Sequence, residues 1–129
     1  MRKKTKTDSV SYYIEKNNLI KALNYARKKS EYYLETKNYT AYCDIMIQKS
    51  EVYREFNDLE NTIKTLYEAR NIAETNHLLE KQVLAYRAIG NTNGIILEYT
   101  KGKKYLNKAN KIALKLKDND LLIKVNQGL

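Results

Sequence analysis

The chain repeats itself at an interval of forty residues. The segments 13–26, 53–66 and 93–106 can be placed one above another, and the side chains keep their character from column to column. One column holds large apolar residues, namely Leu19, Leu59 and Tyr99. A second column holds the small residues Ala22, Thr62 and Gly102, and a third holds the apolar residues Ala26, Leu66 and Leu106. Three matching passes over 129 residues indicate a stack of similar units.

Within each unit the apolar residues follow the spacing of α-helices. One run recurs every three or four residues through Tyr42, Met46, Ser50, Tyr53 and Phe56. Proline is absent and only four glycines occur, so the main helix breakers are missing. Turn-forming pairs, Asn17-Asn18 and Asn57-Asp58, interrupt the apolar runs, and their side chains are suited to capping the next helix. Each unit is therefore predicted to be helix, tight turn, helix.

The sequence predicts an all-α chain with a single repeat domain over residues 1–129. The expected units are 1–37, 38–77 and 78–117, followed by the start of a further or capping helix over 120–129. Helices are expected at 8–16, 19–36, 39–55, 59–75, 78–96 and 99–117, with a seventh beginning near Asp120. The small residues Ser50 and Gly90 and the small column mark the places where antiparallel helices approach closely.

This pattern resembles the tetratricopeptide repeat (TPR) family. The residues that carry the resemblance are Ser50, Tyr53, Asn57, Leu59, Thr62, Leu66 and Ala69 in the middle unit, Gly90, Tyr99, Gly102, Leu106 and Ala109 in the third, and Tyr13, Leu19 and Ala22 in the first. The chain departs from the family in lacking its closing proline, in Lys49 at a leucine column, in Asn93 at an aromatic column, and in a spacing longer than the usual ~34 residues. Long units of this kind resemble TPR arrays in bacterial signalling proteins and transcription regulators.

The resemblance implies a right-handed superhelix of antiparallel helix pairs, an α-solenoid. It also implies that the first helix of each unit lines a concave groove that binds a protein or peptide. Carried over position by position, the partner-binding residues expected on this face are Asp44, Gln48, Glu51 and Arg54 in the middle unit and Arg87 and Asn91 in the third. Arg87 and Asn91 lie four residues apart and share a helix face, where they either hold a carboxylate or peptide backbone or are simply solvated.

Positive charge is concentrated at the two ends of the sequence. The net charge is +6 over residues 1–37, −3 over 38–98 and +6 over 99–129, which gives the total of +9. This distribution raises the alternative of a nucleic-acid or acidic-partner binder. Lysine outnumbers arginine nineteen to five, however, and many lysines fall late in helices, so solvated helix faces are favoured and nucleic acid is not the expected partner.

Catalysis is not expected. Cys43 is predicted to be a buried, inert thiol, and His77 an exposed side chain in a turn. Nothing in the sequence has the spacing of a metal site, a cofactor cradle or a catalytic triad, so neither a cofactor nor a metal is expected.

No apolar stretch approaches the ~18 residues of a membrane span, and the N-terminal residues lack the apolar run of a signal peptide. A cytoplasmic location is therefore expected. The apolar residues Leu121, Leu122, Ile123 and Val125 would leave the last helix without a partner, which favours a segment of a longer protein over a self-association module.

Overall fold

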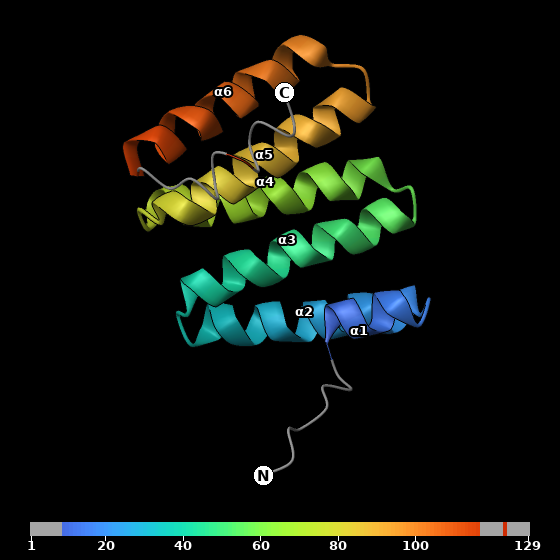
Figure 1. Cartoon of the computed structure of the whole chain (residues 1–129). Helices are drawn as coiled ribbons and strands as arrows, with labels where there is room; N and C mark the ends of the chain where they lie inside the picture. The colour runs from blue at the N-terminus through green and yellow to red at the C-terminus, as the bar shows by residue number, and fades with distance from the viewer. Residues whose placement is uncertain (1–8, 117–122, 124–129) are drawn as a thin grey trace.

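Six α-helices follow one another in the part of the chain that the structure describes. The computed structural model describes residues 9–116 and Ile123. The helices are α1 (Val10–Glu15), α2 (Leu19–Glu35), α3 (Tyr39–Glu55), α4 (Leu59–Thr75), α5 (Leu79–Ile95) and α6 (Tyr99–Leu116). Figure 1 shows them as a stack that runs from α1 and α2 at one end to α6 at the other, with the chain reversing direction at every turn. Among the described residues there is no β-strand, so the all-α prediction is confirmed.

All five turns between helices have the same backbone geometry. The second residue after each helix adopts a positive φ of 55° to 65°, and these residues are Asn17, Lys37, Asn57, His77 and Leu97. Two backbone hydrogen bonds close each turn; in the first, the amide of Asn18 donates to the carbonyl of Tyr13 at 2.8 Å and that of Asn17 to Ile14 at 2.9 Å. This pair of backbone hydrogen bonds is the Schellman motif, which reverses the chain within three residues. The turns therefore recur every twenty residues and set the regular length of α2 to α5.

Side chains at the residue before the helix fix three of the helix starts. Asn18, Asn38 and Asp58 each accept a hydrogen bond from the backbone amide three residues further on, at 3.1 to 3.2 Å. Leu78 stands at the same place before α5 and makes no such bond. The predicted capping role of the Asn17-Asn18 and Asn57-Asp58 pairs is confirmed, since Asn18 caps α2 and Asp58 caps α4.

Helices within a pair approach closely at the small columns. A Cβ added to Gly102 would lie 2.9 Å from the carbonyl oxygen of Gly90, and one added to Gly90 would lie 2.9 Å from that of Gly102. At the equivalent place in the middle unit, the hydroxyl of Thr62 lies 3.5 Å from the carbonyl oxygen of Ser50, and both residues are buried. Small side chains are therefore what allow α3 to pack on α4 and α5 on α6, as the sequence predicts.

The first helices of the pairs also contact one another. α1 touches α3, and α3 touches α5, in addition to the contacts between consecutive helices. The backbones of α2 and α4, and those of α4 and α6, do not approach each other as closely in the described part of the chain. α1, α3 and α5 therefore form an inner row, and α2, α4 and α6 lie further apart on the other side. The fully buried side chains Val52, Leu66, Val83 and Ile89 lie between these two rows.

Side chains span the wider gap between α4 and α6. The guanidinium of Arg70 on α4 donates to the hydroxyl of Tyr105 on α6 at 2.9 Å. The hydroxyl of Tyr86 on α5 donates to the carboxylate of Glu74, also on α4. These polar bridges hold three helices in one arrangement, because each joins residues from different helices.

The observed helices agree closely with the predicted ranges. The ends of α2 to α6 fall within one residue of prediction, whereas α1 begins at Val10 instead of residue 8, because Ser9 caps it by accepting from the Tyr12 amide at 3.1 Å. The seventh helix expected from Asp120 lies outside the described residues apart from Ile123. Over the part of the chain with described positions, no helix combines the length and the apolar character needed to cross a membrane.

Candidate functional site

The predicted binding residues lie on α3 and α5, which touch in the inner row. Asp44 of α3 pairs across the two helices with Lys81 of α5, with 2.7 Å between Nζ and Oδ1. The Lys81 ammonium also lies 3.4 Å from the carboxylate of Glu80. The side chain of Lys81 is only 13% exposed and that of Asp44 is 49% exposed. The Asp44 carboxylate is therefore anchored on one side and open to solvent on the other.

Burial of the Lys81 ammonium disfavours its charge. The hydrogen bond and the charge of Asp44, with a smaller contribution from Glu80, outweigh that effect and raise the pKa of Lys81. The ammonium thus stays protonated, and this end of the α3–α5 surface keeps a fixed pair of opposite charges.

A second group of charges lies further along the same two helices. Restricted hydration raises the pKa of the Glu51 carboxyl, and Arg54 and Arg87 are near enough to oppose that rise. Glu55 adds a like charge that raises the pKa further. Because Glu51 and Arg54 come from α3 and Arg87 from α5, the structure brings three of the predicted residues together across the helix boundary.

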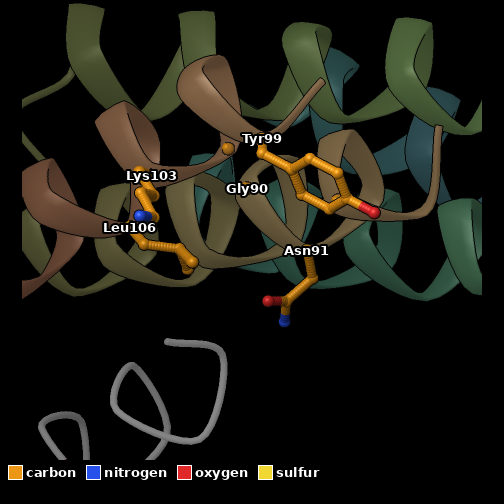
Figure 2. Close-up of a pocket in the computed structure, with 7 residues that line it drawn as sticks. Gly90, Asn91, Tyr99, Lys103 and Leu106 are labelled. Carbon is orange, nitrogen blue, oxygen red and sulfur yellow. The ribbon is translucent and has the colours of Figure 1, made fainter. Parts of the chain in front are cut away.

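Asn91 lies one turn beyond Arg87 on α5 and lines a different hollow. This hollow of about 180 Å³ lies between α5 and α6 where the glycines leave space. Figure 2 shows Asn91 of α5 on one side and Tyr99, Lys103 and Leu106 of α6 around it. Tyr99 belongs to the large apolar column of the repeat, yet it is 61% exposed. Arg87 and Asn91 therefore share a face of α5 but have different surroundings.

Gln48 and Asp44 border a larger hollow beside the start of α1. It measures about 380 Å³, and its lining residues are Ser9, Val10, Ser11, Tyr25, Tyr33, Ala41, Asp44, Ile45 and Gln48. Ser9, Val10 and Ser11 at the start of α1 line one side of this hollow, and residues of α2 and α3 line the rest. Along α3, the hollow at Asp44 and Gln48 is therefore followed by the charged side chains around Glu51.

The reactive residue types lie away from this surface. Cys43 is 1% exposed, its thiol donates to the Ala69 carbonyl at 3.6 Å, and burial raises its pKa to about 11. His77 is exposed in the turn between α4 and α5, as predicted. Over the described positions, no group of three His, Cys, Asp or Glu side chains is arranged to hold a metal ion. The arrangement offers spaced hydrogen-bonding and charged groups on a rigid pair of helices, which suits binding.

Sequence reasoning missed Lys81 as a member of this surface. The sequence patterns assign Lys81 no role. Lys81 lies in the first turn of α5, and Asp44 lies in the second turn of α3, thirty-seven residues earlier in the chain. Such a pair becomes visible only once α3 and α5 are known to touch.

A comparison of the chain with protein-family models and with curated proteins finds no match to either.

Proposed function

We propose that this chain is a TPR-like α-solenoid that binds a protein or peptide along the face formed by α1, α3 and α5. Supporting the solenoid are the forty-residue repeat and the sequential packing of its helix pairs. The single observation that carries the binding proposal is the contact of α3 with α5, which joins the polar residues of two units into one surface.

A partner that carries both positively and negatively charged groups complements this surface. Asp44 offers half of its carboxylate to solvent, while Arg87 and Arg54 supply positive charge further along. A peptide lying along the inner row would meet a carboxylate, an amide at Gln48 and then guanidinium groups. The helices hold these side chains in place before binding, which reduces the entropy lost when the complex forms.

The wider context follows from the same proposal. A groove binder without reactive groups on its binding face serves as a scaffold or sensor segment, and we propose that it belongs to a bacterial regulatory or signalling protein in the cytoplasm. The catalytic step of such a protein would reside in another domain or in the partner.

The test is a peptide selection followed by affinity measurements. Peptides enriched from a displayed random library on the immobilised protein are titrated by isothermal calorimetry against two double variants. Arg87→Ala with Asn91→Ala removes the predicted pair from α5. Asn24→Ala with Lys28→Ala likewise removes one amide and one positive charge, at the same spacing of four, from exposed positions of α2.

The Arg87/Asn91 variant should bind the selected peptides about tenfold or more weakly, since loss of a hydrogen-bonded charged group costs on the order of 1–3 kcal/mol. The Asn24/Lys28 variant should bind as the unchanged protein does. Equal affinities for all three proteins would overturn the proposal that this face is the binding site.

A further inference from the structure

A single stripe of lysines runs along the exposed side of α6. Its members follow alternating steps of three and four residues, and they are Lys101, Lys104, Lys108, Lys111 and Lys115. At about 100° per residue these positions fall within an arc of about 80°, and they span about 21 Å of helix. The side chains are exposed, and the buried face of α6 lies on the opposite side at Gly102, Leu106, Ala109 and Ala113.

No acidic residue offsets this charge within the helix, since the sequence of α6 contains neither Asp nor Glu. The ion pairs formed among described residues involve Arg27 with Glu31, and Lys81 with Asp44 and Glu80, so none includes a lysine of the stripe. Lysines three or four residues apart on a helix repel one another. The stripe therefore carries an electrostatic cost for which α6 itself provides no compensation, and such a cost is expected where a partner supplies the opposite charge.

Two lysines of the stripe are held in place by tyrosines. The ammonium of Lys101 lies 6.0 Å from the centre of the Tyr67 ring, and that of Lys108 lies 5.4 Å from Tyr86. Cation–π contacts restrain the side chains without neutralising them. The remaining three lysines extend from the helix with no described ring near them. A hollow runs beside the stripe, and polar groups at its edge add hydrogen-bond donors: Thr100, Lys103 and Asn107.

We propose that this lysine stripe binds the phosphate backbone of double-stranded nucleic acid without reading its sequence. A duplex carries one negative charge per about 1.7 Å of its axis, so about twelve charges lie within the length of the stripe. Phosphates on the side of the duplex that faces the stripe therefore occur along its whole length. An acidic helix would need five carboxylates at matching steps of three and four, and these would repel one another along that helix. Lysine also suits contacts that carry no base information, because it acts as a point charge where arginine forms a planar fork.

The stripe lies on α6 and shares no residue with the surface formed by α3 and α5, so this inference does not depend on the proposed function. It also modifies the expectation, drawn from the excess of lysine over arginine, that the lysines lie on solvated helix faces and that nucleic acid is not the partner. The five lysines of the stripe share one side of α6, and this alignment is what a polyanion can use.

The experiment measures binding to a fluorescein-labelled DNA duplex of arbitrary sequence by anisotropy, over a series of salt concentrations. If all five lysines meet phosphates, log K should fall with log salt with a slope of about −4.5, a loss of about 500-fold between about 50 and 200 mM. The variant Lys104→Gln, Lys111→Gln and Lys115→Gln keeps the two tyrosine-bound lysines and should reduce the slope to about −1.8, a loss of about 12-fold.

The control is Lys21→Gln, Lys28→Gln and Lys64→Gln, which removes the same charge from exposed positions on α2 and α4. Its slope should match that of the unchanged protein. Glutamine has nearly the helix propensity of lysine, and circular dichroism checks that both variants remain folded. The proposal is overturned if the duplex does not bind at low salt, if both triple variants lose the same slope, or if polyglutamate of equal charge displaces the duplex as efficiently as unlabelled DNA.

Discussion

A substitution at Lys37 tests the backbone geometry of the turns that recur every twenty residues along this chain. Lys37 lies between α2 and α3 with φ of 58°, in a left-handed conformation that a residue with a Cβ adopts at a cost. Its side chain is exposed and forms no hydrogen bond or ion pair with another described residue. Its backbone amide closes the turn by donating to the Leu34 carbonyl at 3.2 Å, and a glycine keeps that bond. Lys37→Gly should therefore stabilise the fold.

The expected gain is a difference of two conformational terms. Left-handed geometry costs a residue with a side chain about 1–2 kcal/mol. Glycine avoids that cost but loses about 0.5–1 kcal/mol more conformational entropy than alanine when the chain folds. The net difference between Lys37→Gly and Lys37→Ala is about 1 kcal/mol in favour of glycine. Comparison with alanine cancels the loss of the lysine charge, which is common to both variants.

Lys28, an exposed lysine inside α2, supplies a control of opposite sign. There the helix needs ordinary right-handed geometry, so Lys28→Gly should be less stable than Lys28→Ala by about 1 kcal/mol. Urea denaturation followed by far-UV circular dichroism gives the free energy of unfolding for all four variants. A glycine variant less stable than its alanine counterpart at position 37 as well as at position 28 would refute the account of the turns.

Further substitutions probe the close packing and the buried polar groups. Gly102→Ala should destabilise the protein by about 1–3 kcal/mol, because its Cβ would meet the Gly90 carbonyl at 2.9 Å, whereas Gly94→Ala has free space around it and should be neutral or stabilising by up to about 1 kcal/mol in thermal unfolding. The amide nitrogen of Asn93 is buried and has no hydrogen-bond partner in the structure, so Asn93→Leu should raise the melting temperature through a gain of about 1 kcal/mol; a lower melting temperature would count against the unpaired amide. The raised pKa of Cys43, about 11 against the ordinary 9.0, predicts that the native thiol reacts with iodoacetamide at least about 100-fold more slowly than the unfolded chain near pH 8, and equal rates would contradict its burial.

The repeat makes most of the fold predictable from the sequence. Forty-residue periodicity locates the units, and apolar spacing together with the Asn and Asp pairs locates the helix ends to within one residue over α2 to α6. The small columns are also readable, since Gly90 and Gly102 occur where two helices must approach each other. These features are local or periodic, so a single sequence contains them.

The binding surface is less predictable, because it depends on contacts between units. Asp44 and Lys81 are thirty-seven residues apart, and their pairing follows from the contact of α3 with α5, which no local pattern encodes. The same holds for the exposure of Tyr99, whose column is half-buried at Leu19 and Leu59 but open on the last helix pair. Whether a residue in a repeat is buried depends on its neighbouring unit as well as on its column.

The sequence shows an excess of lysine, and the orientation of α6 in the structure shows that five of these lysines lie on one exposed side of the helix. Its steps of three and four residues coincide with the helix period, and the burial of Gly102 and Leu106 fixes which side of the helix faces solvent. Composition gives the number of lysines but not how they are aligned on a helix. The structure supplies the orientation that distinguishes an aligned stripe from scattered solvated charges.

The proposed function is tested most directly by mapping a bound peptide onto the helices. With the protein labelled with nitrogen-15, a peptide from the library selection is titrated while the backbone amide resonances are followed. The account predicts that the largest shifts fall on α3 and α5 around Asp44, Gln48 and Arg87, and that the exposed faces of α2 and α4 remain unperturbed. Shifts confined to α2, α4 or α6, with α3 and α5 unchanged, would contradict the claim that the inner row forms the binding groove.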